Sequence, residues 1–363
     1  MVSNTVHSVN FTESLATFLP ELKTQIRDML GKICGRHHMP ERIASRVDEY
    51  FGRCLDYNIV GGKLARARTV SEVVRVCMGC EFRPESDQAK AALVLGWAIE
   101  ILQAFFLIED DVMDRGEVRR GQPCWYKVPD VGVANAINDG LLLEQVLYEL
   151  IELNEYTKPL SVAAHRKLRD ASMRTVIGQH LDTHPPASVT DFTRDQWLSV
   201  VRFKTAFYTF VLPCELGLLA SGRTFSVSDV ATLKDICLLL GELFQAQDDM
   251  LDCFGDPVVI GKVGRDIEEG KCTWLWYTAM EALSGTEKAS ELVSLYSSPS
   301  RASDPVIVSK IKNIYREINI DEKFTAYLAS LQRDIDERVA QLAAGELQQL
   351  SRWLVESTVG RKK

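Results

Sequence analysis

Histidine is scarce in this chain of 363 residues, and its cysteines follow no pattern. It has six histidines and nine irregularly placed cysteines. An odd, irregular set of cysteines in a long chain favours reduced thiols over a secreted disulfide framework. His180 and His184 lie four apart but lack the glutamate of a zinc HExxH motif. Neither a disulfide scaffold nor histidine-based zinc chemistry is therefore expected.

The sequence also lacks an excess of positive charge. Fifty acidic against 42 basic residues give a net charge of −8, so bulk charge favours neither nucleic acid nor an anionic membrane surface as a partner. The first residues lack both the basic start with an apolar core of a signal peptide and the arginines of a mitochondrial presequence. We expect a cytoplasmic protein that binds an anionic substrate only where cations gather locally.

No Pro- or Ser-rich linker divides the chain, and no convincing pair of alternating strands with a hairpin turn is present. Apolar residues spaced three and four apart dominate instead, which is typical of amphipathic helices. We expect one all-α domain over residues 1–363, a bundle of roughly ten or more helices, with residues 1–10 as a candidate disordered segment. The clearest helical stretches are residues 11–30, 134–153, 230–247 and 323–350.

The most apolar run, residues 91–108, is interrupted only by Glu100 and Gln103 and leads directly into acidic residues. It is long enough to be mistaken for a membrane span. A helix that is apolar on nearly all sides and ends in carboxylates is better interpreted as the buried central helix of a bundle, with a polar mouth at one end. We expect no membrane span.

Two acidic clusters share one pattern, in which an aromatic residue is followed by three residues and then by Asp-Asp-x-x-Asp. They begin at Phe106 and at Phe244. Residues four apart share a helix face, so the first and third aspartates of each cluster align and the middle one is turned about 100° aside. The aspartates are Asp110, Asp111 and Asp114 in the first cluster and Asp248, Asp249 and Asp252 in the second.

Like charges at the C-terminal end of an apolar helix repel one another and oppose the helix dipole, so a cation should compensate them. Carboxylates without partnering His or Cys suit Mg²⁺, which takes one or two carboxylates and shares phosphate oxygens with a substrate. Two facing clusters could hold a diphosphate between several Mg²⁺ ions. One cluster alone would be interpreted as a solvated acidic helix end, but two copies that close apolar helices disfavour that interpretation.

With these clusters and its other motifs, the sequence resembles the trans-isoprenyl diphosphate synthase family, and most closely its farnesyl diphosphate synthase branch. The resemblance extends from about Phe11 to the C-terminus and implies an all-α fold around a central cavity. The further motifs are Gly61-Gly62-Lys63 with Arg66, Arg119-Arg120-Gly121-Gln122-Pro123, Gly178-Gln179 with Asp182, Lys204-Thr205, and Lys262 with Lys271.

The resemblance implies a magnesium-dependent prenyltransferase that joins dimethylallyl or geranyl diphosphate head-to-tail to isopentenyl diphosphate. The products would be farnesyl diphosphate, a precursor of sterols and other isoprenoid lipids, and diphosphate. The six aspartates would bind three Mg²⁺, for which Mn²⁺ is a candidate substitute. The resemblance also implies a homodimer with a complete site in each subunit.

The family pattern assigns the remaining site residues. The allylic diphosphate would contact Arg119, Lys204, Lys262, Asp182 and Gln179, and isopentenyl diphosphate would contact Lys63, Arg66, Gln103 and Arg120. Thr205, Gln245 and the Lys204-Thr205 backbone are candidates to stabilise the cation, although ordinary hydrogen bonding inside a bundle explains them equally well. The tail Arg361-Lys362-Lys363 is similar to the family's basic C-terminus, but by itself it is more typical of a solubilising end.

Product length can be argued from the helix that carries the first cluster. Phe106 lies one turn before Asp110 and Phe105 lies beside it, so both rings should project where a growing chain must extend. The paired Phe resembles the farnesyl-length pattern, and replacing both by Ala should lengthen the product. Plain core packing is the alternative role for both rings.

The first substrate loop departs from the family's usual Asn-Arg-Gly, because the Asn and Gly positions are Ala65 and Ala67. The missing amide could weaken isopentenyl diphosphate binding, and Ala67 would be strained if that position had positive φ. A terpene synthase, which ionises a prenyl diphosphate without condensation, is therefore the first alternative. The persistence of Lys63, Arg66, Gln103 and Arg120 argues against it. An inactive helical subunit is a more remote alternative, since all six aspartates are present.

Overall fold

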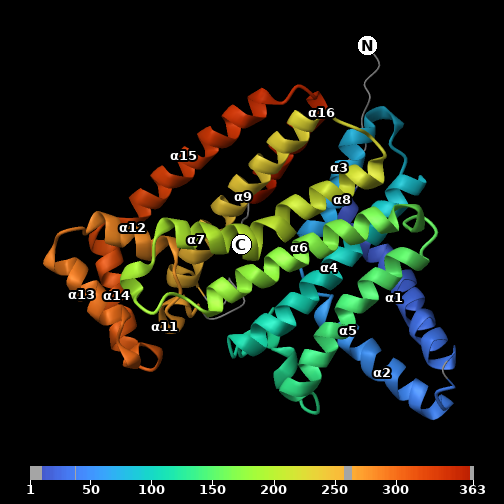
Figure 1. Ribbon diagram of the computed structural model, residues 1–363, viewed down its shortest axis with the longest axis horizontal. Helices are drawn as coiled ribbons and strands as arrows, with labels where there is room; N and C mark the ends of the chain where they lie inside the picture. Colours follow the sequence, from blue (N-terminus) through green and yellow to red (C-terminus); the bar gives the residue numbers. More distant parts are fainter. Residues whose placement is uncertain (1–9, 37, 257–263, 360–363) are drawn as a thin grey trace. The chain divides into compact units, whose positions relative to one another are not determined.

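Helices dominate the computed structural model of the chain, which describes residues 10–36, 38–256 and 264–359 (Figure 1). These residues form more than ten helices, so the all-α prediction is confirmed. They group into two compact units, which are described separately below. The prediction that residues 1–363 form one domain remains a prediction.

Unit one comprises Met1–Glu117, Pro123–Lys167 and Pro213–Thr224. Within it α4 lies between α3 and α5 and packs against both. Its helices are α1 (Phe11–Arg36), α2 (Glu41–Asn58), α3 (Ala65–Met78), α4 (Asp87–Met113) and α5 (Gly132–Leu153), with short 3₁₀ turns η1 (Gly79–Glu81), η2 (Trp125–Lys127) and η3 (Lys158–Leu160).

Helix α4 is the core helix that the apolar run predicted. Its N-terminus is capped by the Ser86 side chain, which accepts a hydrogen bond from the Ala89 backbone N–H. Within the part of the chain that the structure describes, two helices are long and apolar enough to cross a membrane by composition, Asp87–Met113 and the continuous stretch Arg194–Ser221. Protein buries 78% of the apolar window in the first and 50% in the second, and a mostly buried helix of this kind is a core helix.

Unit two comprises Val118–Gln122, Leu168–Leu212 and Phe225–Lys363. Its centre is α9, which packs against η5, α15, α16 and α12. Its elements are η4 (Val189–Asp191), α7 (Arg194–Val200), the π-helix η5 (Val201–Val211), α9 (Val227–Phe254), α11 (Asp266–Glu269), α12 (Trp274–Ala282), α13 (Glu287–Tyr296), η6 (Pro299–Ala302), α14 (Pro305–Glu317), α15 (Ile320–Gln341) and α16 (Gly345–Val359). Helices α6 (Ser161–Thr183) and α8 (Leu212–Ser221) have residues in both units.

Close packing in unit two depends on a glycine and on large aromatic side chains. A Cβ at Gly241 of α9 would lie 2.3 Å from the Ala206 Cβ of η5, so only glycine allows this approach of the two helices. Trp197, Trp274 and Trp276 are each at most 1% exposed and belong to one apolar core. Their burial stabilises the packing of α7 and α12 beside α9.

One short hairpin corrects the expectation that no strand pair would form. Strands β1 (Val118–Arg119) and β2 (Gln122–Pro123) pair, and the two central residues of the turn, Arg120 and Gly121, have φ of 54° and 76°. Positive φ at both positions is typical of a type I′ turn. With only two residues per strand, the hairpin has no alternating apolar pattern that a sequence could reveal.

Candidate active site

The first acidic cluster lies where α4 ends. Asp110 is on the last turn and Asp114 is the C-cap, whose backbone N–H donates to the Asp110 carbonyl at 2.8 Å. Asp111 is 6% exposed, whereas Asp110 and Asp114 are half-buried. The first and third aspartates therefore share the more open side of the helix, as the spacing predicts, and the middle one points inward.

A fourth carboxylate, Glu109, precedes this cluster and faces α5. A Cβ at Gly140 of α5 would lie 2.4 Å from Glu109 Oε1 and 3.3 Å from the Phe105 ring, so the missing side chain of Gly140 leaves the space that Glu109 occupies. That oxygen is buried and accepts no hydrogen bond from the described residues. Burial raises the pKa of Glu109 to about 7, because desolvation disfavours the charged form.

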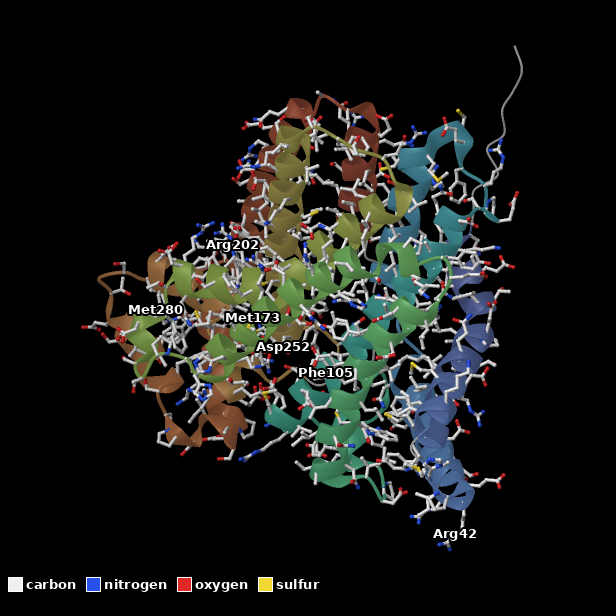
Figure 2. The ribbon with its side chains drawn as sticks, turned by 45° about the vertical axis from the view of Figure 1, so that its right-hand side comes forward. Arg42, Phe105, Met173, Arg202, Asp252 and Met280 are labelled. Carbon is white, nitrogen blue, oxygen red and sulfur yellow. The ribbon has the colours of Figure 1, made fainter. Side chains whose placement is uncertain are left out.

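The two phenylalanines before the cluster occupy different faces of α4. Phe105, which is labelled in Figure 2, is 7% exposed. It lies one turn before Glu109, on the side of α4 that packs against Gly140. Phe106 is half-buried and lies one turn before Asp110. Their ring centroids are 5.0 Å apart. Phe106 therefore shares the face of the acidic cluster, and the Phe105 ring packs beside the Phe106 ring from the neighbouring face of α4.

The predicted isopentenyl diphosphate residues of unit one lie on α4 and around the start of α3. Lys63 is exposed, Arg66 is 8% exposed and Gln103 of α4 is half-buried. The residue with positive φ is Leu64, at 50°, whereas Ala67 lies in the helix. Ala67 therefore does not have the positive φ that would have strained it.

Two features of α4 hold Ala67 in place. Its backbone N–H donates to Glu100 Oε1 at 3.1 Å, and Glu100 is 4% exposed. A carboxylate at a helix N-terminus satisfies an N–H that has no partner within the helix. A Cβ at Gly96 would lie 3.0 Å from the Ala67 Cβ, so glycine on α4 provides the space for the extra methyl group on α3.

The second acidic cluster lies near the end of α9 in unit two. Asp248 is half-buried, Asp249 is 3% exposed and Asp252 is 8% exposed. Asp252 Oδ1 accepts a hydrogen bond from the Asp266 backbone N–H at 2.9 Å. The chain after α9 thus returns to contact the third aspartate and fixes its side chain.

Asp249 is surrounded by hydrogen-bond donors. Its Oδ2 accepts from Trp197 Nε1 at 2.9 Å and from the Trp274 backbone N–H at 2.7 Å, and its Oδ1 accepts from Gln245 Nε2 at 2.9 Å. Burial raises the pKa of Asp249 to about 7, although these three hydrogen bonds act in the opposite direction. The middle aspartate is thus joined to α7, to α12 and to the preceding turn of α9.

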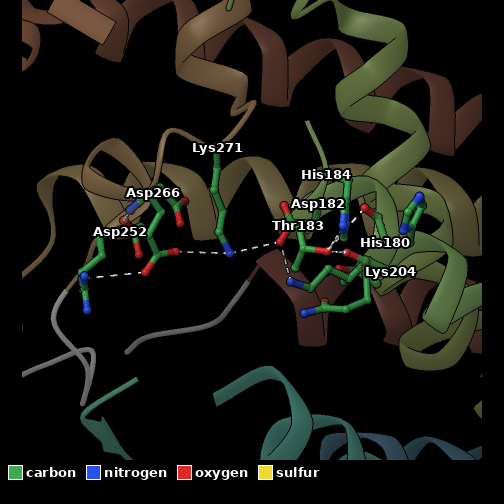
Figure 3. A network of polar contacts seen from close by, with 12 residues as sticks. His180, Asp182, Thr183, His184, Lys204, Asp252, Asp266 and Lys271 are labelled. Atoms are coloured by element: carbon green, nitrogen blue, oxygen red, sulfur yellow. Dashed lines mark hydrogen bonds and ion pairs between the residues drawn. The ribbon is translucent and has the colours of Figure 1, made fainter. Parts of the chain in front are cut away.

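A second polar group of unit two centres on Asp182 of α6 (Figure 3). Its Oδ2 lies 2.7 Å from Lys204 Nζ and 3.0 Å from Lys271 Nζ. Burial alone would raise the pKa of Asp182, but the two ammonium groups outweigh it and hold the pKa below its usual range. Asp182 therefore keeps the ammonium groups of two lysines together.

Helix η5 approaches α6 closely where Lys204 lies. A Cβ at Gly178 would lie 2.1 Å from the Lys204 backbone nitrogen, so the predicted Gly178-Gln179 motif has a packing reason. Next to Lys204, the Thr205 hydroxyl donates to Gln245 Oε1 at 3.1 Å. The two candidate cation-stabilising side chains are therefore in contact. π-Helical segments such as η5 are frequent at functional sites.

The remaining predicted site residues are only partly described. Arg119 lies on β1, Arg120 lies in the hairpin turn, and Gln179 lies on α6 with its side chain half-buried. Lys262 and the tail Arg361-Lys362-Lys363 lie outside the described residues.

The carboxylates fit magnesium better than a metal that needs a closed set of protein ligands. Among residues 10–36, 38–256 and 264–359, no group of three or more His, Cys, Asp or Glu side chains is arranged to hold a metal ion. Each cluster instead offers carboxylates one helical turn apart. This donor set matches Mg²⁺, which usually keeps several waters and adds substrate phosphates to one or two carboxylates.

Comparison with known proteins identifies the family of the chain. Residues 48–318 match the family model described as polyprenyl synthetase. The chain belongs to the polyprenyl synthetase family. The match includes both acidic clusters and the residues around Asp182, so the motifs discussed above lie within the family region.

Relatives of this family member are similar over most of their length. The farnesyl pyrophosphate synthase of Saccharomyces cerevisiae is 36% identical over 300 residues, which is 81% of this chain and 83% of that protein. Farnesyl pyrophosphate synthase 1 of Cannabis sativa is 39% identical over 282 residues, covering 77% and 80% of the two chains. T. brucei farnesyl diphosphate synthase complexed with a bisphosphonate superposes with a TM-score of 0.86 at 29% identity, over 97% of this chain and 99% of that one.

Sequence reasoning missed three groups that contact the predicted site of this polyprenyl synthetase. Lys271 was noted as a motif residue but not as a partner of Asp182. Trp197 and Trp274 bind Asp249, yet no spacing in the sequence relates them to α9. Gly140 and Glu109 meet across α4 and α5, and only the unusual acidic residue before Asp110 could have indicated that contact.

Proposed function

We propose that the protein is a farnesyl diphosphate synthase that extends dimethylallyl and then geranyl diphosphate with isopentenyl diphosphate. The observation that carries the proposal is the pair of Asp-Asp-x-x-Asp clusters at the ends of α4 and α9 in a chain of this family. The names of the relatives and the retained Lys63, Arg66 and Arg120 support condensation rather than cyclisation.

In the proposed reaction, the C–O bond of the allylic diphosphate breaks and its electron pair leaves with the diphosphate. The π-bond of isopentenyl diphosphate then forms a C–C bond to the allylic cation, and a proton passes to the released diphosphate. Lys204 and Lys271 would bind the leaving diphosphate, because Asp182 holds them together. Thr205 and Gln245 would face the cation with their oxygen atoms.

We propose that Asp110 and Asp114 of α4 and Asp248 and Asp252 of α9 hold the metal ions. Three Mg²⁺ are expected, with Mn²⁺ as a substitute. Bound Mg²⁺ would neutralise the diphosphate and so stabilise the charge that develops as the C–O bond breaks. The inward position of Asp111 and Asp249 suits an orienting role better than a ligand role.

The proposal is tested by incubating the protein with labelled isopentenyl diphosphate, Mg²⁺ and either dimethylallyl or geranyl diphosphate, followed by chain-length analysis. We expect C15 product whose formation needs both Mg²⁺ and isopentenyl diphosphate. Turnover of the allylic substrate that is indifferent to isopentenyl diphosphate would indicate a terpene synthase. Complete inactivity with every short prenyl diphosphate would indicate a non-catalytic subunit.

Product length is proposed to depend on Phe106 supported by Phe105. Replacing both by Ala should shift the product beyond C15, and Phe106→Ala alone should shift it more than Phe105→Ala, because Phe106 shares the face of Asp110. Unchanged C15 output from the double variant would contradict this role and leave both rings as core residues.

We propose that two copies of the chain associate through exposed apolar residues on α5. In unit one, Val133, Ile137 and Leu141 recur every fourth residue of α5 and are 49%, 40% and 50% exposed. Stripes of this kind are typical of protein interfaces. Light scattering should give twice the chain mass, and Leu141→Glu should lower it to one chain, whereas Val227→Glu, at an exposed position of α9, should not.

We also propose a cytoplasmic location, because the irregularly placed cysteines favour reduced thiols and the most apolar helix is a core helix. Fractionation of cells that express the full chain with a C-terminal tag should recover it with cytosolic markers. Recovery with organelle or membrane markers would contradict this proposal and leave the catalytic one unaffected.

A further inference from the structure

The orientation of one side-chain amide in unit two follows from its neighbours. Gln245 has a donor end, its NH₂ group, and an acceptor end, its carbonyl. Its Nε2 lies 2.9 Å from Asp249 Oδ1, and its Oε1 lies 3.1 Å from the Thr205 hydroxyl. The NH₂ group donates to the carboxylate oxygen and therefore faces Asp249, while the carbonyl accepts from the Thr205 hydroxyl. The carbonyl of Gln245 is thereby directed toward Thr205.

Asp249 is held in place by two groups that can only donate. Its Oδ2 accepts from the indole Nε1 of Trp197 and from the backbone N–H of Trp274. Trp197 and Trp274 are each 1% exposed, and Asp249 is 3% exposed. Because both donors are fixed in the packed core of unit two, the carboxylate cannot turn without leaving a buried N–H unsatisfied. Its remaining oxygen is therefore fixed toward Gln245.

We propose that Asp249 is a positioning residue rather than a metal ligand, and that it orients the Gln245 carbonyl toward the allylic cation beside Thr205. This inference rests on the proposed function, because the cation forms only in prenyl diphosphate chemistry. The negative end of the carbonyl dipole would face the developing positive charge, where a preorganised dipole stabilises the transition state. A reversed amide would present its positive NH₂ end and would destabilise the cation.

The isosteric substitution Asp249→Asn should change the orientation of the Gln245 amide without changing the shape of the side chain at position 249. The Asn carbonyl must occupy the Oδ2 position, because Trp197 and Trp274 both donate there. The Asn NH₂ group then lies at the Oδ1 position and donates toward Gln245. Gln245 must in turn present its carbonyl to residue 249, which reverses its amide. The substitution should therefore destabilise the allylic cation while leaving the packing around residue 249 unchanged.

The experiment compares wild type, Asp249→Asn and the matched neighbour Asp248→Asn at one pH. We measure kcat, its Mg²⁺ dependence, and Mg²⁺-dependent binding of inorganic diphosphate by calorimetry. Asp249→Asn should lower kcat about 10- to 100-fold. Its half-saturating Mg²⁺ concentration and diphosphate affinity should stay within about twofold of wild type. Asp248→Asn should weaken metal-dependent diphosphate binding about tenfold or more.

A second background tests whether Asp249 acts through Gln245. Gln245→Met removes the amide while keeping the length of the side chain, and it should lower kcat by a similar factor. Adding Asp249→Asn to Gln245→Met should cause no further loss, because no amide remains to reverse. Trp197→Phe is a third variant, which removes one donor that holds Asp249. It should lower kcat severalfold with unchanged Mg²⁺ dependence.

Two results would overturn the inference. One is a loss of Mg²⁺-dependent diphosphate binding in Asp249→Asn that equals the loss in Asp248→Asn, which would make Asp249 a ligand. The other is an undiminished effect of Asp249→Asn on kcat in the Gln245→Met background. If the wild type transfers no prenyl group, the proposed function fails. The binding comparison still decides whether Asp249 is a ligand, because it needs no catalysis.

Discussion

The two acidic clusters share a sequence pattern but have different surroundings. In unit two, the middle aspartate Asp249 is joined by hydrogen bonds to α7, α12 and the preceding turn of α9. In unit one, the cluster follows Glu109, a half-buried carboxylate with an oxygen that accepts no hydrogen bond from the described residues, whereas the matching residue in unit two is the neutral Gln247. In unit two, the motif thus contains a buried aspartate that accepts three hydrogen bonds. In unit one, the same motif follows a glutamate whose buried oxygen accepts no hydrogen bond from the described residues.

The largest effect is expected where the clusters should behave alike. Asp110→Asn and Asp248→Asn should each reduce kcat/KM by at least about 100-fold, because each removes a charge that is proposed to bind metal and leaving diphosphate. Steady-state kinetics with circular dichroism as a control for folding would measure this. Loss of activity in only one variant would show that the clusters have unequal roles.

The next effect should separate the middle aspartate of unit two from its neighbour. Asp249→Ala leaves the buried N–H groups of Trp197 and Trp274 without an acceptor, which should lower the free energy of unfolding by about 3 kcal/mol. Asp248→Ala, at the adjacent half-buried position, should change it by less than about 1 kcal/mol. Urea denaturation in metal-free buffer measures both, and equal losses would contradict the comparison.

Glu109→Gln makes the residue before the first cluster match the one before the second. Because burial raises the folded-state pKa of Glu109 from 4.5 to about 7, the folded state binds this proton more tightly than the unfolded state. Stability should therefore fall as pH rises from about 4.5 to 7, and this part of the pH dependence should vanish in Glu109→Gln. The variant should be about 2 kcal/mol more stable at about pH 8, as measured by urea denaturation without metal. A variant no more stable than wild type would contradict this account.

The smallest effect concerns the contact between α4 and α5. Gly140→Ala would place its Cβ against Glu109 and should be destabilising in the wild type. In a Glu109→Ala background the same change should be neutral or stabilising, because Ala is the better helix former. A double-mutant cycle should give a coupling of about 1 kcal/mol, and additive effects would show that the two residues do not meet.

The sequence predicted the features that depend on local periodicity. The 3.6-residue repeat identified the helices, and the four-residue spacing placed Asp110 with Asp114 and turned Asp111 aside. It could not predict contacts between distant segments. Trp197 of α7 and Trp274 of α12 converge on Asp249 of α9, and nothing in their spacing relates them. The hairpin at β1 and β2 escaped prediction because two-residue strands carry no period.

The expected strain at Ala67 shows a second limit. Family pattern indicated where glycine is usual, but only the structure shows that the left-handed residue is Leu64. Backbone conformation at a loop-to-helix boundary depends on what the helix packs against, here Glu100 and Gly96 of α4. A departure from a motif must therefore be judged together with the residues that touch it.

The contact between Ala67 and Gly96 also has an evolutionary consequence. The two helices have room for one methyl group at this crossing, and in this chain α3 carries it. Restoring glycine at position 67 alone would leave a small void, and adding alanine at position 96 alone would crowd the crossing. The two positions are therefore epistatic, and across homologues they should covary, so that a chain with glycine at the first position tolerates alanine at the second.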